Sequence, residues 1–569
     1  MTSMLGKGYW LTASIVSCLI VAGVLLAVQY DSLVKTSAPT SSQQQKNISG
    51  TLKGGSSIPI GNHTLTVQAR TASGKTVQAS TNFTVNANSD PYKALIIYPT
   101  PRTAAQDSEV AGACRSLGDA ANVFDIKQFG AKGDGITDDY AAMRGAAAFI
   151  SQPENAGKTL YYPPGTYKVD KVIDRKAYPD NTQADFFNIR YVNPQNIKLI
   201  GCGAIIDVKG DFKKNKRAFI SGNLWRGDLA QVSPFDIRFG SGFLVSGFEI
   251  YGNLDKMSKD NSVDIVEDGG RGLSTSGGQN YVLENLNIHG FSTDGMFLGV
   301  GFEYKPDINA TVRNVILKGN GRQGLSIQQM RGGTFTNVQF LSTGVGAYGG
   351  HSPRAGVDIE PIYCVSDCPD SMNRKAQGLS ANTGDITFTN CTFSDNLGAQ
   401  LVSAGNLGTE NITVQNSTFN NLNSGSRAAI ALDGKNGVIA NNTFVTAKTA
   451  IAIDAATPTV DIHDNTITSV ATTPFRFPVV EISAGTVSFK NNHIIIPASA
   501  YNDQNSVVVN LAAVTTSALN IFETTLSDSV KKAFTVTYGS GTKVQQDNYL
   551  QPKYIKPFGI TTFTNPYSK

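Results

Sequence analysis

Apolar and polar residues alternate over short stretches along most of the chain after residue 48, and these stretches end at Asn, Asp or Gly. Alternation with a period of two predicts half-buried β-strands, and the residues at the ends predict tight turns. From Gly50 to Asn86 the pattern predicts a hairpin that turns at Ser73 to Lys75. The chain is therefore expected to be built almost entirely from short strands.

Beyond residue 122 the strand-like stretches recur at a nearly regular interval. An Asn or Asp precedes each one, at Asn285, Asn314, Asn337, Asn390, Asn416, Asn441, Asp464 and Asn491. The successive intervals are 29, 23, 53, 26, 25, 23 and 27 residues. One coil of a parallel solenoid per repeat explains this period, and the interval of 53 indicates either an insertion or two coils. The phrase Asn-x-Thr-Phe at three of these positions predicts stacked turn residues and the buried rings Phe393, Phe419 and Phe444.

A second phrase follows the turns, and one copy reads Gly356-Val357-Asp358-Ile359-Glu360. Successive side chains of a strand point to opposite faces, so Val357 and Ile359 are expected to face the core. Asp358 and Glu360 then share the outer, exposed face. Superposing the copies stacks Ser326 with Asp358 and Gln328 with Glu360, and places Asp433 and Asp454 further along the column. This predicts a polar groove suited to a linear polymer.

The repeated region begins with two recognisable segments, residues 124–139 and 160–167. Thr137 is predicted to cap a short helix that carries Asp138 and Asp139 in its first turn, where the helix dipole favours acids. Together the segments resemble the start of the pectate-lyase-like superfamily, in its rhamnogalacturonase/epimerase branch. The resemblance implies an all-β, right-handed parallel β-helix whose open end is plugged by that helix.

The domain organisation follows from these patterns. Trp10 to Val28 is uncharged and about as long as a membrane-crossing helix, which favours a retained membrane anchor over a cleaved signal and places the rest of the chain outside the cytoplasm. The hairpin region resembles an immunoglobulin-like module but is shorter than the ~100 residues of a complete one. The predicted parts are 1–31 signal anchor or signal peptide, 32–47 polar spacer, 48–88 small partial immunoglobulin-like module, 89–121 linker, 122–500 parallel β-helix, and 501–569 C-terminal strands and cap.

Charge and cysteine content narrow the partners. The net charge of +4 is spread along the chain without a basic block, which excludes a nucleic-acid partner. An exported chain permits disulfides, and the close spacing of Cys364 and Cys368 predicts a local bridge. A pair between Cys114 and Cys202 is a second prediction, which leaves Cys391 free. The Cys and His spacing does not match a metal site.

Two long turns flank the Asp358 strand, at residues 344–354 and 363–384. Long loops around one strand of a regular solenoid commonly serve a site. Paired carboxylates separated by two strand residues suit acid and base roles at a glycosidic bond. Asp294 lies in a phrase that resembles the Asn-Thr-Asp phrase of polygalacturonases. The candidate catalytic residues are Asp358, Glu360, His351 and Asp294, and the candidate substrate-binding residues are Arg322, Arg331, Arg354, Tyr363, Gln328 and Asp433.

The predicted function is a glycoside hydrolase that acts on an acidic or deoxy-sugar polysaccharide and requires no cofactor. One alternative is a uronate polysaccharide lyase or C5-epimerase, which removes a proton beside a carboxylate. Another is a non-catalytic surface β-helix that binds glycans or adheres. Asp358 and Glu360 would then be plain surface residues, or would bind a structural calcium ion together with the carboxylates of the column.

Overall fold

The computed structural model describes residues 61–70, 76–85, 95–101, 117, 119–174, 177, 187–214, 217–219, 225–227, 229–259, 270–299, 306–345, 352–361, 383–403, 409–422, 428–454, 459–471, 477–497, 507–525, 534–550 and 555–558. The chain divides into two units, residues 1–96 and 97–569. In the first unit, β1 (Gly61–Arg70) and β2 (Thr76–Val85) form an antiparallel hairpin with Gly61 opposite Val85. The described residues include no helix long and apolar enough to cross a membrane. The predicted anchor at residues 10–28 lies outside them.

The second unit begins with a capped end. Its short elements are η2 (Ala120–Asn122), β3 (Val123–Asp125), η3 (Ile126–Phe129), β4 (Asp134–Asp138), α3 (Tyr140–Ile150) and η4 (Pro153–Asn155). The helix was expected here, but the predicted cap is wrong. Thr137 lies within β4 and donates its hydroxyl to Asp134. Asp139 takes the N-cap position, and its carboxylate instead accepts the N–H groups of Lys132 and Gly133.

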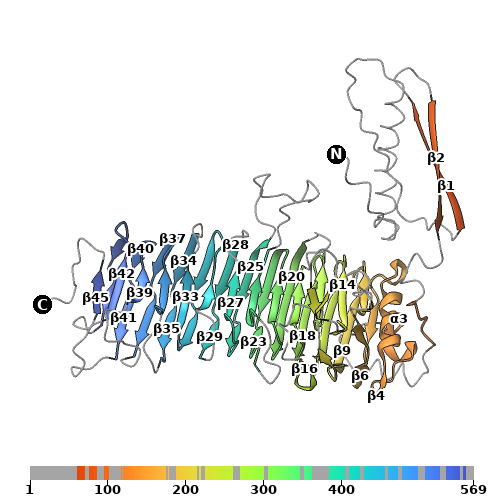
Figure 1. Cartoon of the computed structure of the whole chain (residues 1–569), viewed down its shortest axis with the longest axis horizontal. Coiled ribbons are helices and arrows are strands. Elements are labelled where there is room, and N and C mark those ends of the chain that lie inside the picture. The colour runs from red at the N-terminus through yellow and green to blue at the C-terminus, as the bar shows by residue number, and fades with distance from the viewer. Residues whose placement is uncertain are drawn as a thin grey trace. The chain divides into compact units, whose positions relative to one another are not determined.

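Thirteen of the described strands form one parallel sheet, called here the first sheet (Figure 1). It stacks one strand per coil from the capped end toward the C-terminus. Its strands are β8 (Arg190–Val192), β14 (Phe235–Arg238), β17 (Leu273–Ser276), β19 (Asp294–Leu298), β21 (Gln323–Ile327), β24 (Ala355–Ile359), β27 (Leu401–Ser403), β30 (Ala428–Ala431), β33 (Thr449–Ile453), β36 (Val480–Ile482), β39 (Val507–Leu511), β42 (Phe534–Tyr538) and β45 (Ile555–Phe558). Parallel pairing thus continues beyond residue 500, where the sequence repeat fades.

The other faces of the coils are also parallel. The second face contains β5 (Thr159–Tyr161), β9 (Lys198–Val208), β15 (Leu244–Tyr251), β18 (Val282–His289), β20 (Asp307–Lys318), β22 (Met330–Thr336), β25 (Thr383–Thr389), β28 (Thr409–Gln415), β31 (Gly437–Ala440), β34 (Thr459–His463), β37 (Thr486–Lys490), β40 (Val514–Ala518) and β43 (Lys543–Gln545). The long strands β9, β15, β18 and β20 continue with their C-terminal halves into the third face. The third face also contains β6 (Thr166–Val169), β23 (Gln339–Leu341), β26 (Thr392–Ser394), β29 (Thr418–Asn421), β32 (Thr443–Thr446), β35 (Thr466–Ser469), β38 (His493–Ile496), β41 (Ile521–Thr524) and β44 (Asn548–Tyr549).

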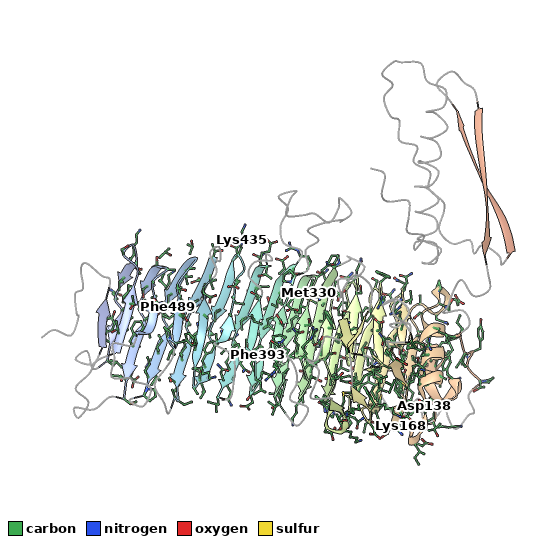
Figure 2. The ribbon with its side chains drawn as sticks, viewed as in Figure 1. Asp138, Lys168, Met330, Phe393, Lys435 and Phe489 are labelled. Carbon is green, nitrogen blue, oxygen red and sulfur yellow. The ribbon has the colours of Figure 1, made fainter. Side chains whose placement is uncertain are left out.

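Near the capped end, short strands and a turn lie outside the three faces. They are β7 (Val172–Asp174) with β13 (Leu229–Gln231), β10 (Lys213–Lys214) with β16 (Ser258–Lys259), β11 (Arg217–Phe219) with β12 (Trp225–Gly227), and η5 (Leu254–Lys256). Figure 2 shows Asp138 and Lys168, partners in the β4–β6 register, at the same end.

The interval of 53 residues in the sequence is one coil with an insertion. β23 pairs directly with β26, with Gln339 opposite Thr392, so no second coil intervenes. The insertion lies in the turns on both sides of β24. This confirms one of the two interpretations of the repeat and places the extra chain length beside the strand that carries Asp358.

The predicted turn residues hold the coils together. All eight of the repeated Asn and Asp residues have φ between 52° and 57°, the left-handed conformation that Asn and Asp tolerate best among residues with a side chain. The residue after each turn faces inward and forms a ladder. Asn442, Asn465 and Asn492 each accept the backbone N–H of the preceding ladder residue, at 2.9 to 3.1 Å.

Stacked rings fill the interior beside this ladder. Phe340, Phe393, Phe419 and Phe444 stack with centroid separations of 4.8, 4.4 and 4.7 Å, as the repeat predicted. Figure 2 shows Phe393 and Phe489 within the stack of coils. Continuous burial of aromatic and aliphatic side chains from coil to coil gives the solenoid its core, because a single coil cannot bury an apolar face alone.

Candidate active site

The site strand β24 lies in the middle of the first sheet. Ser326 of β21 is opposite Asp358, and Val402 of β27 is opposite it on the other side. Val357 and Ile359 are fully buried in the core. On the next strand, Ala431 is opposite Val402 and so shares the row of Asp358. Asp433, two residues later, therefore shares the row of Glu360. The predicted stacking of Ser326 with Asp358 is therefore confirmed.

The predicted exposure of this pair is wrong for Asp358. Its side chain lies on the outer face of the strand, yet the residue is only 3% exposed, and Glu360 is half-buried. Alternation along a strand determines which face a residue occupies but not whether other parts of the chain cover that face. Asp358 is therefore a carboxyl group largely removed from water.

Burial and the neighbouring Glu360 raise the pKa of Asp358 well above the usual range. The protonated Asp358 carboxyl also hydrogen-bonds to the Glu360 carboxylate, which raises that pKa further. The charge of Arg322 and a hydrogen bond from Gln323 act in the opposite direction. Asp358 consequently holds a proton at pH values where an ordinary aspartate is ionised.

Arg322, which directly precedes β21, and Gln323, the first residue of β21, contact two carboxyl groups on neighbouring coils. Arg322 donates to both oxygens of Asp294, at 2.8 and 2.6 Å. Gln323 donates its Nε2 hydrogen to Oδ2 of Asp358, at 2.5 Å. All four side chains are buried. Arg322 therefore contacts both carboxylate oxygens of Asp294, which suits Asp294 to holding the arginine beside Asp358.

A second arginine and an aromatic ring complete this cluster. Arg271 lies 3.9 Å from Asp294 Oδ2, and its guanidinium is 4.0 Å from the centroid of the Phe297 ring. Arg322 lies over the same ring at 5.9 Å. Phe297 is opposite Ser326 in the first sheet. The sequence prediction omitted Arg271 and Gln323, because the reach of a long side chain between coils is not readable from strand alternation.

The structure separates Arg331 from this cluster. Arg331 belongs to β22 on the second face, where it pairs with Asp385 at 3.2 Å and Glu410 at 2.5 Å. Arg354 is half-buried at the turn before β24, with φ of 58°. Gln328 and Asp433 are half-buried at the expected rows.

Several predicted residues fall outside the described part of the chain: His351, Tyr363, Cys364, Cys368 and Cys114. Cys202 is disulfide-bonded, and Cys391 is free and buried. Within the described ranges, no group of three or more His, Cys, Asp or Glu side chains is arranged to hold a metal ion.

The amino-acid sequence is similar to one protein family over part of its length. Residues 123–352 match the model of the family described as rhamnogalacturonase A/epimerase, pectate lyase-like. The match confirms the resemblance to the pectate-lyase-like superfamily that the segments at 124–139 and 160–167 indicated.

The individual proteins that are similar to this chain share only a small part of its sequence. Mannuronan C5-epimerase AlgE3 of Azotobacter vinelandii is 26% identical over 218 residues, which is 38% of this chain and 10% of the epimerase. This chain therefore spans about a tenth of that relative's length. Among solved structures, the surface adhesin PfbA of Streptococcus pneumoniae has a TM-score of 0.47 at 14% identity, covering 77% of this chain and 91% of that one. The family 28 exopolygalacturonase of Yersinia enterocolitica has a TM-score of 0.37 at 13% identity, covering 88% and 83%.

Proposed function

We propose that this protein is a polysaccharide-processing enzyme that hydrolyses a glycosidic bond, with the Asp358–Glu360 pair as its proton donor. The observation that carries the proposal is the buried carboxyl group of Asp358 beside Glu360, since burial and that neighbour raise its pKa well above the usual range. A general acid must be protonated at the working pH and close to the leaving oxygen. Strand β24, which lies within the first sheet on the coil that carries the insertion, is the location expected for such a group.

The surroundings of Asp358 support proton donation as well as proton retention. Glu360 favours the protonated form, whereas Arg322 stabilises the carboxylate that remains after the proton has left. Together, Glu360 keeps the proton on Asp358 and Arg322 allows Asp358 to release it to the substrate. Asp294 supports this balance by fixing the guanidinium of Arg322 with two hydrogen bonds.

The contact between the two carboxyl groups limits the mechanism. Retaining enzymes separate their carboxyl groups by about 5 Å and inverting enzymes by about 6.5 to 9.5 Å, so that the sugar or a water fits between them. Hydrogen-bonded carboxyl groups are closer than either separation. Asp358 and Glu360 therefore act together on one side of the scissile bond. His351, the remaining candidate for the base, lies outside the described residues.

We propose an acidic polysaccharide as the substrate, at a location outside the cytoplasm. Two similar proteins are named as epimerases of mannuronan, a polymer of a uronic acid. The two arginines beside Phe297 provide positive charge close to Asp358. The apolar run at residues 10–28 supports export and membrane anchoring.

A C5-epimerase is the second candidate, because two mannuronan C5-epimerases are each 26% identical over 218 residues. An epimerase removes and returns a proton at C5 without cutting the chain. The protonated Asp358 would then return the proton to the sugar.

Product analysis separates the two candidates. The purified full-length protein is incubated with uronate-containing and neutral polysaccharides, followed by assays for reducing ends, ultraviolet absorbance of unsaturated ends, and nuclear magnetic resonance of the polymer. Hydrolysis predicts new reducing ends without unsaturation. Unsaturated ends would replace hydrolysis by a lyase reaction, and altered sugar configuration without new ends would replace it by epimerisation.

A further inference from the structure

We propose that Gln323 is a positioning residue that determines which oxygen of Asp358 carries the transferable proton. The proposal rests on the role of Asp358 as proton donor. Gln323 was not among the residues that the sequence indicated. Its side chain bonds directly to Asp358 but is itself neutral and does not transfer a proton.

The geometry identifies the oxygen. Gln323 Nε2 lies 2.5 Å from Asp358 Oδ2, and both residues are buried, at 0% and 3% exposure. An amide N–H group donates, and the carbonyl-type oxygen of a carboxylic acid accepts more strongly than its hydroxyl oxygen, so this bond favours Oδ2 as the unprotonated oxygen. The proton that Asp358 shares with Glu360 therefore resides on Oδ1. One hydrogen bond thus gives the two oxygens of Asp358 different roles.

The backbone around Gln323 is suited to holding this arrangement rigid. Gln323 is in register with Ala355 of β24 and with Asp294 of β19. The next residue, Gly324, lies against the carbonyl of Gly356, and a Cβ atom there would be 2.6 Å from that oxygen. On the other side, Arg322 is held by Asp294. Gln323 is fixed between these contacts, so its amide meets Asp358 at a defined position.

The opposite amide orientation makes a contrasting prediction. If Oε1 faced Asp358, the aspartic acid would donate its proton to Gln323, and the amide would stabilise the protonated form. With Nε2 facing Asp358, the amide stabilises the carboxylate. Removing the amide is therefore expected to raise the pKa of Asp358 if Nε2 faces it, and to lower that pKa if Oε1 faces it.

Infrared titration of the protonated carboxyl band measures this shift without any substrate. The full-length wild type, Gln323→Met and Gln323→Asn are compared, and Asp358→Asn identifies the band. A hydrogen bond to a charged group corresponds to about one pH unit or more, so the band midpoint is expected to move upward by about that amount in Gln323→Met. Gln323→Asn, with a shorter amide, carries the same expectation if the Met variant fails to fold. Circular dichroism establishes folding.

Thr343→Val is the matched control, because it removes a buried hydroxyl from a neighbouring coil without a bond to Asp358. Its band is expected to titrate as in the wild type. An unchanged or downward-shifted midpoint in the folded Gln323 variants would overturn the proposal. Where polysaccharide cleavage is measurable, kcat is expected to fall about tenfold with KM unchanged, since only the proton donor is affected. If the wild type cleaves none of the polysaccharides, the proposed reaction is rejected. The infrared titration still tests whether Gln323 bonds to the unprotonated oxygen of Asp358.

Discussion

Asp307, at the start of β20, is expected to make the solenoid more stable in mild acid. Its carboxylate is fully buried and accepts hydrogen bonds from Thr275, from Tyr281 at 2.7 Å, and from the N–H groups of Gly278 and Gly299 at 2.8 and 3.0 Å. Burial raises the pKa of Asp307 from 3.8 to about 6, although the four hydrogen bonds oppose this shift. Asp307→Asn removes the titrating group.

The sign and size of the expected change in unfolding free energy follow from the linkage between proton binding and folding. A raised pKa means that the folded state binds the proton more tightly than the unfolded state, so the stabilisation is complete below 3.8 and is lost as the pH rises through about 6. Acidification from about pH 7.5 to about pH 5 crosses the folded pKa of about 6 and covers about one pH unit of this window. One pH unit below the folded pKa corresponds to about 1.4 kcal/mol of stabilisation.

Urea unfolding followed by circular dichroism tests this value. The difference in unfolding free energy between the wild type and Asp307→Asn is expected to change by about 1.4 kcal/mol between the two pH values, in favour of the wild type in acid. Asp119→Asn is the control, because Asp119 is an exposed helix cap that Asn replaces well. An equal pH response in the wild type and Asp307→Asn would refute the reasoning.

Two further substitutions test the contacts between coils by their urea midpoints. Asn465→Ala removes the hydrogen bonds to the buried Asn442 N–H and Ile439 carbonyl of the preceding coil and is expected to cost about 3 kcal/mol. The exposed Thr443→Ala should cost under about 0.5 kcal/mol. Equal costs would argue against the ladder. Gly299→Ala would place a Cβ 1.8 Å from the Gln329 carbonyl oxygen and is expected to lose about 3 kcal/mol or more. Gly157→Ala, with a similar φ of +78° and open space, should lose only about 1 kcal/mol, so similar losses would show that backbone strain alone explains Gly299.

Much of the solenoid could be predicted because its constraints are local. Each coil needs a left-handed turn residue, and Asn390, Asn416 and Asn441 meet that need where the sequence repeats. Phe393 and Phe419 each lie three residues after such an Asn, so they occupy equivalent positions on adjacent coils and stack. The capping interaction could not be predicted, because Thr-Asp-Asp offers three capping residues and the sequence does not determine which of them the chain uses.

The candidate site was only partly predictable. Strand register placed Ser326 beside Asp358, since equal phrases on adjacent coils align. The burial of Asp358 and its bond to Gln323 depend on packing between coils and beyond the strand, which leaves no periodic signal. Arg331 was expected near the site from its distance along the chain, but it follows the corner of the coil and belongs to another face.

The measurement that tests the central claim most directly is the rate of polysaccharide cleavage by Asp358→Asn. Asparagine keeps the shape of the side chain but has no acidic proton, so the rate is expected to fall by about 10²- to 10⁴-fold. Asp119→Asn, which alters an exposed carboxyl group near the capped end of the solenoid, should cleave like the wild type. If folded Asp358→Asn cleaves at the wild-type rate, Asp358 does not supply the proton.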